Sequence, residues 1–291
     1  MLGQKTVQEL SAHFSIVGLN RTKDSSLMLS ESISLNINDF ELIRDVLRRL
    51  NPSVIIHTAA IVDVEYCEYN KEACSLTNFY AVKNIVDNLE KDTLLIFIST
   101  ESVFDNTSQA PTEESKKNPP NHYCKTKSDS EDYIISNHSN HIILRTNMYG
   151  FHKNWRGSLV EWAINKLQRG ERIGGYTDVV FNPLYTGQIA KAILELIKIN
   201  FKGIIHLGSN LVLSKLEFTT RLAKALNLNE GLVYKSSIES GSFVKRNKYA
   251  VLDITKAESI ISMKNLDFNL GFDNLIEDLK DRYEKNNNWY I

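Results

Sequence analysis

The sequence predicts an α/β protein built on a doubly wound parallel sheet, with a smaller, mostly helical lobe toward the C-terminus. Three observations lead to this fold class. Continuous apolar runs at 53–60 and 93–100 are typical of strands that are buried on both faces of a parallel sheet. These runs alternate with helical patterns up to about residue 150, the order expected when helices connect parallel strands. Beyond residue 150 the alternation loosens and helical patterns dominate.

The individual elements follow from hydrophobic periodicity and from capping residues. Residues 39–50 place apolar side chains on one helical face, and Asp39 is a plausible N-cap. The elements expected in the first half are, in order, a helix from Gln4, strands at 14–19 and 32–37, a helix at 39–50, a strand at 53–60, a helix at 71–90, a strand at 93–100, a helix from about Tyr123 and a strand at 141–150.

The second half is expected to contribute one more sheet strand and a separate lobe. Helical patterns end at Gly170 and begin again near Thr186, and the run at 203–209 is strand-like. We therefore divide the chain into a dinucleotide-binding domain, residues 1–150 plus 183–209, and a substrate lobe, residues 151–182 plus 210–291. The lobe is expected to close over the carboxyl ends of the strands.

Composition narrows the classes of partner. The 291 residues carry a net charge of -1, from 34 basic and 35 acidic side chains, so charge favours neither nucleic acid nor a membrane surface as partner. No apolar run reaches the length of a membrane span. The spacing and odd number of Cys67, Cys74 and Cys124 predict reduced thiols in a cytoplasmic protein rather than a zinc site or a disulfide framework. No spacing indicates any other metal site.

Polar residues follow three of the expected strands. In doubly wound sheets ligands bind beyond the carboxyl ends of the strands, which here are Thr58–Ala60, Ser99–Ser102 and Arg145–Tyr149. A hydroxyl at Ser99, Thr100 or Ser102 is placed to bind a substrate carbonyl. The alternative is that these hydroxyls satisfy loop backbone groups.

Tyr123 and Lys127 form a Y-x-x-x-K pair on the helix expected from about residue 123. Positions i and i+4 share a helical face, so the ammonium is expected to lower the pKa of the phenol and make it a proton donor or acceptor. The alternative is that both side chains lie on a helix surface without a chemical role, because a Y-x-x-x-K spacing often occurs by chance.

Several segments together resemble the extended short-chain dehydrogenase/reductase superfamily, and within it the dTDP-4-dehydrorhamnose reductases and their sugar-nucleotide-binding relatives. The resemblance implies a Rossmann-type fold, a nicotinamide cofactor and a nucleotide-linked sugar substrate. The segments that carry it are VIIHTAAIVDVEYCE (54–68), LTNFYAV (76–82), IFISTESVFD (96–105), YCKTK (123–127), ILRTNMYG (143–150), FNPLYTGQIAKAI (181–193) and NKYAVLDITKAE (247–258).

The resemblance assigns roles to single positions. Thr100 would bind the keto oxygen, Tyr123 would donate the proton, and Lys127 would lower the phenol pKa and hold the nicotinamide ribose. Cofactor contacts would come from Gly3, Arg21, Asn36, Ile37, Thr58, Ala59, Ala60, Asn78, Ser99, Tyr123, Lys127 and Thr146. Substrate contacts would come from Thr100, Glu101, Ser102, Asn147, Met148 and Asn182. Departures from the family pattern at Glu101, Asn147–Met148 and Phe181–Asn182 bear on which sugar is bound.

Arg21 bears on the choice of cofactor. An arginine at this strand end, with no acidic residue beside it, favours a 2′-phosphate and so NADP(H) over NAD(H). The alternative is a solvated loop cation.

The leading hypothesis is an NADPH-dependent reductase of the C4 keto group of a nucleotide-linked 4-keto-6-deoxysugar, acting in the synthesis of cell-surface polysaccharide sugars. The superfamily resemblance suggests a homodimer. One alternative is a non-catalytic sugar-nucleotide- or NADP-binding protein, such as a regulatory subunit. Another is an epimerase on the same scaffold.

The first residues, MLGQKTVQEL, match the end of a glycine-rich phosphate loop and the helix after it. Gly3 corresponds to the last of three glycines. We expect the first strand and the other two glycines to be missing from this chain. Either Met1 is an internal methionine, or the chain is a decayed member with weakened cofactor binding.

Overall fold

A four-stranded parallel sheet forms the centre of the computed structural model, which describes residues 1–21, 28–105, 109–152, 157–240 and 244–286. Its strands are β3 (Val54–His57), β4 (Leu94–Thr100), β5 (His141–Thr146) and β10 (Gly203–Leu207), in the order β10-β5-β4-β3. Every residue of β4 and β5 is buried. The α/β fold with a parallel sheet is therefore confirmed.

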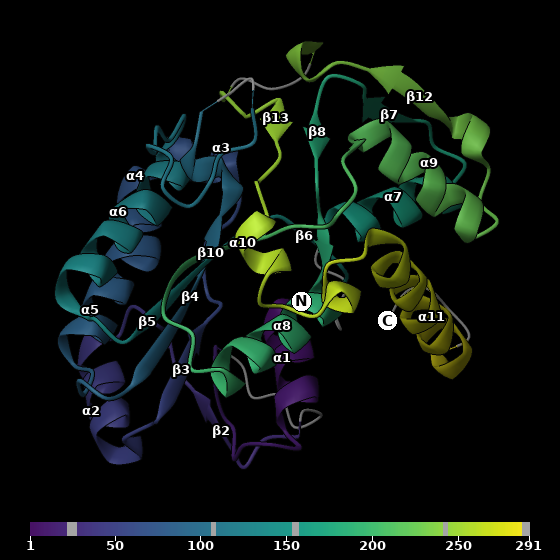
Figure 1. The fold of residues 1–291 in the computed structure, drawn as a ribbon. Coiled ribbons are helices and arrows are strands. Elements are labelled where there is room, and N and C mark those ends of the chain that lie inside the picture. The colour runs from purple at the N-terminus through teal and green to yellow at the C-terminus, as the bar shows by residue number, and fades with distance from the viewer. Residues whose placement is uncertain (22–27, 106–108, 153–156, 241–243, 287–291) are drawn as a thin grey trace.

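Helices cover both faces of this sheet (Figure 1). Ile96 and Ile98 of β4 pack toward α1 (Leu2–Leu10) and α8 (Thr186–Lys198). Leu95 and Phe97 point to the opposite face, toward α5 (Ala81–Asp87) and α6 (His122–Asn137). Alternate residues of one strand thus enter two separate cores, which explains why its sequence is apolar without interruption.

A second, smaller parallel sheet lies next to the first. It consists of β1 (Val17–Asn20) and β2 (Glu31–Ser34), paired in register from Val17 opposite Glu31. No residue of either strand is fully buried. Within the described residues neither strand pairs with β3. The β1 strand begins later than expected because the turn after α1 continues to Phe14, whose N–H donates to Leu10.

Helix α2 (Phe40–Leu50) begins as expected, because the Asp39 side chain accepts the Leu42 N–H at 3.1 Å. The helix expected at 71–90 is instead divided into α4 (Lys71–Ser75), a π-helical turn η1 (Leu76–Tyr80) and α5. Helix α3 (Val64–Tyr69) precedes α4, and the non-helical backbone of Asn70 separates the two.

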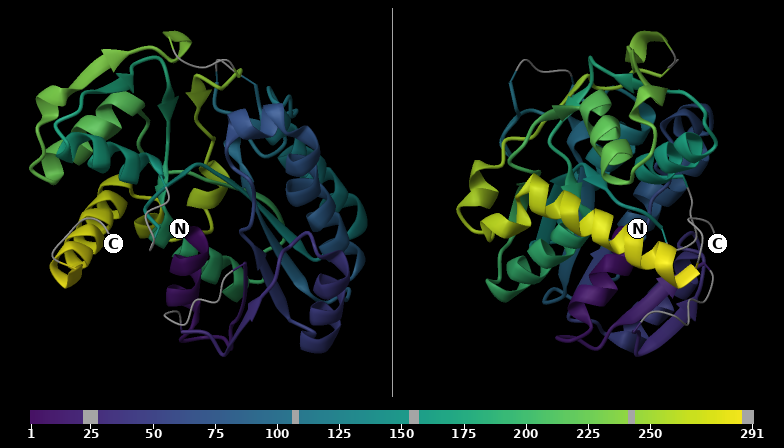
Figure 2. Two further views of the ribbon diagram at one scale, coloured as in Figure 1. Left: turned by 180° about the vertical axis from the view of Figure 1, so that it is seen from behind. Right: turned by 90° about the vertical axis from the view of Figure 1, so that its right-hand side faces the viewer.

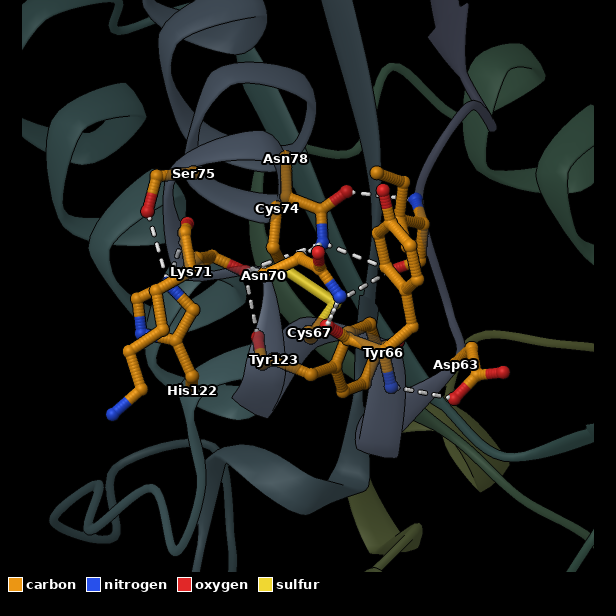
Figure 3. The surroundings of a disulfide bond; sticks show 12 residues. Asp63, Tyr66, Cys67, Asn70, Lys71, Cys74, Ser75, Asn78, His122 and Tyr123 are labelled. Carbon is orange, nitrogen blue, oxygen red and sulfur yellow. Dashed lines mark hydrogen bonds between the residues drawn. A yellow bond between two sulfur atoms is a disulfide. The ribbon is translucent and has the colours of Figure 1, made fainter.

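Cys67 of α3 and Cys74 of α4 form a disulfide, and both side chains are fully buried (Figure 3). The expectation of reduced thiols is therefore wrong for this pair. The residues lie seven apart, and the break at Asn70 folds α4 back so that their Cα atoms are 5.2 Å apart. Cys124 is a free, buried cysteine.

The second half of the chain builds a further region (Figure 2). The core of this region is rich in aromatic side chains. Its helices include α7 (Leu159–Gln168), α9 (Lys215–Ala225) and α11 (Phe268–Asn286). These helices are accompanied by two small sheets. One pairs β7 (Ile173–Tyr176) with β12 (Val233–Ser236), and the other orders β11 (Leu213–Ser214), β8 (Val180–Phe181) and β13 (Tyr249–Ala250). The proposed division into two domains stays a prediction.

The remaining short elements connect these parts. They are η2 (Glu101–Val103), β6 (Met148–Tyr149), β9 (Leu184–Tyr185), η3 (Glu230–Leu232), η4 (Ile238–Ser240), α10 (Thr255–Glu258) and η5 (Met263–Asn265). Lys5 of α1 forms a 2.6 Å salt bridge with Asp278 of α11, so the last helix is tied to the first. No helix in the described part of the chain is long and apolar enough to span a bilayer.

Candidate active site

The carboxyl end of β4 presents two hydroxyls and one carboxylate. The chain turns from β4 into η2, and the Thr100 hydroxyl caps this turn by accepting the Ser102 N–H at 3.1 Å. Thr100 Oγ1 donates to Glu101 Oε2 at 2.8 Å, and Ser102 Oγ donates to Glu101 Oε1 at 2.9 Å. The Glu101 carboxylate therefore holds both neighbouring hydroxyls.

Helix α6 brings Tyr123 to these groups. The Asn121 side chain caps the helix by accepting the Cys124 N–H at 3.0 Å, which fixes the first turn. Helix α6 packs against β4 and η2, which sets the Tyr123 phenol near Thr100 and Glu101, so that both act on its pKa. Lys127 follows one turn later and is 3% exposed. The three residues expected to be catalytic are thus brought together by one strand end and one helix.

The electrostatics of Tyr123 differ from the expectation. Burial, and next the charge of Glu101, raise the pKa of the Tyr123 phenol above its ordinary value. The expected lowering by Lys127 is wrong, because Lys127 Nζ lies over the Phe97 ring, 3.8 Å from its centre. Loss of solvation outweighs the neighbouring ammonium, so the phenol is protonated at neutral pH.

Burial also lowers the pKa of Lys127, to about 7, while Glu131 one turn along α6 acts in the opposite direction. Glu131 is itself held in a buried network. Arg145 Nη2 donates to Glu131 Oε2 at 2.8 Å, and Ser99 Oγ donates to Glu131 Oε1 at 2.5 Å. Ser99 is expected near the cofactor, but its hydroxyl hydrogen-bonds to Glu131 within this buried network.

The residues expected at the cofactor phosphates gather at the end of β3. Thr58 and Ala59 are exposed and Ala60 is half-buried, so this strand end is open. Gly3 lies beside it at the start of α1, where an added Cβ would come within 3.1 Å of Thr58 Oγ1. A glycine at a helix N-terminus next to small, open residues leaves room for the close approach of a phosphate.

Asn78 fixes the loop that follows these residues. Its side-chain amide accepts the Ile61 N–H at 2.8 Å and donates to the Ile61 carbonyl at 2.9 Å. The same amide nitrogen lies 3.3 Å from Cys74 Sγ and from Thr126 Oγ1 (Figure 3). Asn78 is expected among the cofactor contacts. In the structure its side chain links the loop after β3, the disulfide and α6.

Three further residues expected at the cofactor lie around the β1–β2 sheet. Arg21 is exposed just beyond β1, and its carbonyl accepts the Ser34 hydroxyl at 3.0 Å. Asn36 is exposed beyond β2, and Ile37 packs against the core between α2 and α5. They form a group apart from Tyr123, as an extended dinucleotide would require.

The residues after β5 are largely occupied by backbone contacts. Thr146 is buried and donates to the Asn147 carbonyl at 3.3 Å. Asn147 Nδ2 donates to the Ala250 carbonyl at 2.8 Å, while its Oδ1 is buried and has no hydrogen-bond partner among the described residues. Met148, in β6, packs against the main core.

The Asn182 side chain likewise forms hydrogen bonds with the backbone. Its Nδ2 donates to the Leu252 carbonyl at 2.9 Å, and its Oδ1 accepts the Leu252 N–H at 3.0 Å. The side chain is 2% exposed. The backbone of Leu252 therefore occupies both polar atoms of the Asn182 side chain.

Lys215 is a charged residue of this site that no sequence motif singled out. It is the first residue of α9, and its Nζ lies 3.3 Å from the centre of the Phe181 ring. Burial lowers the pKa of Lys215 to about 8, and Glu101 acts in the opposite direction. The S-x-x-E capping box at Ser214–Glu217 marks the helix start in the sequence, but not where the side chain points.

A parallel sheet that carries Thr100 at a strand end, with Tyr123 and Lys127 one helical turn apart, defines the extended short-chain dehydrogenase/reductase class. Residues 1–281 match the family described as RmlD substrate binding domain, and the chain belongs to that family. The resemblance inferred from its motifs is thereby confirmed.

The chain is similar to a subunit of a methionine adenosyltransferase and to a polysaccharide biosynthesis protein. The chain is 29% identical over 245 residues to methionine adenosyltransferase 2 subunit beta of Xenopus tropicalis, covering 81% of this chain and 73% of that protein. It is 24% identical to the spore coat polysaccharide biosynthesis protein SpsK of Bacillus subtilis, over 75% of this chain and 77% of that protein.

Solved structures share the fold. A hypothetical dTDP-4-dehydrorhamnose reductase from Sulfolobus tokodaii superposes with a TM-score of 0.79 at 27% identity, covering 90% of this chain and 91% of its own. The dTDP-4-dehydrorhamnose reductase of Bacillus anthracis in complex with NADP gives 0.81 at 20% identity, covering 90% and 98%. The chain thus shares its fold with solved sugar-nucleotide reductases.

Proposed function

We propose that this protein reduces the C4 keto group of a nucleotide-linked 4-keto-6-deoxysugar with NADPH, in the synthesis of cell-surface polysaccharide sugars. One observation carries the proposal. Helix α6 packs against β4 and η2 and sets the Tyr123 phenol near Thr100 at the end of β4, with Lys127 one turn further along α6. Membership of the RmlD family and the likeness to SpsK support the substrate class.

The residues at the end of β3 fit a nicotinamide dinucleotide. Gly3, Thr58 and Ala59 leave an open floor at a helix N-terminus, which suits a diphosphate. Exposed Arg21 beyond β1 suits a 2′-phosphate, hence the preference for NADP(H). A reduced nicotinamide, when bound, supplies the hydride.

The chain's own residues would supply the proton and the orientation. Thr100 holds the sugar's carbonyl oxygen by exchanging its bond to Glu101 for one to substrate. Tyr123 stays protonated until an alkoxide, a much stronger base than water, develops beside it and takes the phenolic proton. Lys127, one turn further along α6, would hold the nicotinamide ribose.

The test is NADPH oxidation with dTDP-4-dehydrorhamnose. Tyr123→Phe removes the proton donor, and we expect turnover to fall by about 100-fold or more while NADPH binding is retained. Tyr133→Phe is the matched control, because Tyr133 lies on the same helix and its hydroxyl instead bonds Asp87 and Lys83. Wild-type turnover in Tyr123→Phe would refute the proposed role.

A second candidate is a binding subunit without catalysis. Its support is the 29% identity to methionine adenosyltransferase 2 subunit beta, together with a Thr100 hydroxyl already bonded to Glu101 and a Tyr123 pKa raised by burial. Titration with NADPH separates the two candidates. Tight binding with no turnover of any dTDP-4-keto sugar would favour the subunit. A cytoplasmic location and a homodimer remain predictions.

A further inference from the structure

We propose that the Cys67–Cys74 disulfide is a redox-active site, whose reduction by a dithiol releases α3 and loosens the loop after β3, residues 58–63. The oxidised form is then the state that binds the cofactor. The consequence for cofactor binding rests on the proposed function, whereas the contacts of the disulfide do not.

The disulfide is the buried anchor of α3. Of the six residues of this helix, Cys67 alone is buried. Tyr66 and Tyr69 of the same helix are 44% and 73% exposed. An element with so little buried surface opens locally at a low cost in free energy. A dithiol therefore reaches the Cys67 sulfur when α3 opens, while the sheet stays folded.

The two sulfurs also contact the groups that fix the loop after β3. Cys67 Sγ lies 3.7 Å from the Ile61 carbonyl oxygen. Cys74 Sγ lies 3.3 Å from Asn78 Nδ2, and the Asn78 amide bonds both the N–H and the carbonyl of Ile61 (Figure 3). Ala60, at the open strand end proposed to accept the cofactor, immediately precedes Ile61. A shift of either sulfur therefore reaches the proposed cofactor site through a single residue.

A second set of contacts runs from this region to the first turn of α6. Thr126 Oγ1 lies 3.9 Å from Cys74 Sγ and donates to the Tyr123 carbonyl at 2.7 Å. On α3, the Glu68 carboxylate accepts the His122 N–H at 2.9 Å. Both contacts end beside the proposed proton donor. Release of α3 is therefore expected to disturb the start of α6 as well as the loop after β3.

The chemical step is thiol–disulfide exchange. A thiolate of the dithiol attacks Cys67 Sγ, the S–S bond breaks, and Cys74 leaves as a thiolate that takes up a proton. The second thiol of the reductant then attacks the mixed disulfide and releases the Cys67 thiol. Two electrons and two protons pass to the protein, and the reductant leaves as a disulfide. Unbonded thiol sulfurs are too large to lie at bonding distance, so in this fully buried position α3 must move relative to α4.

The first experiment measures whether the pair exchanges in the folded protein. The full chain is equilibrated without denaturant in mixtures of reduced and oxidised dithiothreitol. Free thiols are then alkylated in denaturant and located by peptide mass spectrometry. Cys67 and Cys74 should become alkylated together as the reduced fraction rises, and Cys124 should be alkylated throughout. A pair that never oxidises, or that is reduced only after denaturant is added, overturns the proposal.

The second experiment measures the release of α3 without any ligand. Amide hydrogen exchange in peptides covering 58–69 should be about tenfold faster in the reduced form than in the oxidised form. Peptides from the fully buried β5 are the internal control. Equal exchange of 58–69 in the two forms would refute the release. This comparison uses the unmodified chain, so it does not depend on the folding of a variant.

Two variants show that the response belongs to this disulfide. Cys67→Ala removes the bond, so residues 58–69 should exchange like the reduced form with or without dithiothreitol. Cys124→Ala is the matched control and should respond to dithiothreitol as the unmodified chain does, because Cys124 lies outside the bond. A response to dithiothreitol that persists in Cys67→Ala would contradict the assignment.

Titration of the two forms with NADPH tests the consequence for the cofactor. The dissociation constant should rise about tenfold on reduction, because only molecules with the loop in place bind NADPH. Faster exchange of 58–69 on reduction, with no NADPH binding in either form, would keep the redox-active site and refute the proposed cofactor function. Equal NADPH affinity and equal exchange in both forms would keep the cofactor function and refute the redox-active site.

Discussion

The β4–β5 pair and the β1–β2 pair are both parallel strands, yet they are built differently. Every residue of β4 and β5 is buried, whereas β1 and β2 have no fully buried residue. The first pair carries Thr100 and the Glu131–Arg145 network beneath it, and the second carries Arg21 and Asn36 at its ends. The residue proposed to bind the keto oxygen therefore lies on fully buried strands. The residues proposed to bind the nucleotide lie at the ends of partly exposed strands.

The largest expected effect tests the buried side of this comparison. Arg145→Met leaves the Glu131 carboxylate, which is fully buried, without its guanidinium partner. We expect a loss of about 3–5 kcal/mol in the free energy of unfolding, measured by urea denaturation. A loss below about 1 kcal/mol would mean that Lys117, 3.2 Å from Glu131, suffices to compensate the charge.

A smaller effect is expected at the disulfide, which joins α3 to α4. Replacing Cys67 and Cys74 together by alanine removes a cross-link that closes a short loop, at a cost of about 2–3 kcal/mol. Asn78 contacts Cys74 and holds the loop after β3, so NADPH affinity should fall as well. Cys124→Ala, outside the cross-link, is the control. An unchanged unfolding midpoint in reducing and oxidising buffer would contradict this role.

Acid should destabilise the packed side through His57 on β3. Burial, and next Lys127, lower the pKa of His57 from 6.5 to about 3. A lowered folded-state pKa means that the unfolded chain binds more protons. The contribution is therefore complete above pH 6.5 and decreases by roughly 1.4 kcal/mol per unit as pH falls toward 3. Unfolding measured from pH 7 to pH 5 checks this, and His57→Gln should flatten the dependence.

The smallest effect is expected on the exposed side. Arg49 of α2 and Glu31 of β2 form an ion pair at 2.9 Å with side chains 55% and 42% exposed. Arg49→Met should leave the free energy of unfolding almost unchanged, because water and salt screen this pair. The same urea assay on Arg145→Met and Arg49→Met gives two losses in the free energy of unfolding. Their difference measures how much more a buried arginine–glutamate pair stabilises the fold than an exposed one. Equal losses would refute the contrast between the two regions.

Apolar runs, capping residues and motifs predicted the features of the structure that depend on residues close together in the sequence. The apolar runs at 53–60 and 93–100 marked β3 and β4, Asp39 marked the start of α2, and the motif residues identified the family. The pKa of Tyr123 was predicted with the wrong sign, because desolvation depends on the packed fold rather than on the i+4 neighbour.

The features that escaped prediction depend on chain reversals. Cys67 and Cys74 meet only because the backbone breaks at Asn70. Lys215 lies over the Phe181 ring only because β11 pairs with β8 and sets the start of α9 there. Neither spacing in sequence nor residue type contains this information, since distant segments determine it.

The π-helical turn at Leu76–Tyr80 has a consequence for the length of this segment. A π turn accommodates one residue more than an α-helical turn, and each residue of an α-helix rotates the following side chains by about 100°. Deleting one residue here would restore a regular helix and change the rotational phase of everything on one side of the deletion. Either Asn78 would turn away from Ile61, or the apolar face of α5 would leave the sheet. The segment is thus a fixed-length spacer, more sensitive to deletion than to substitution.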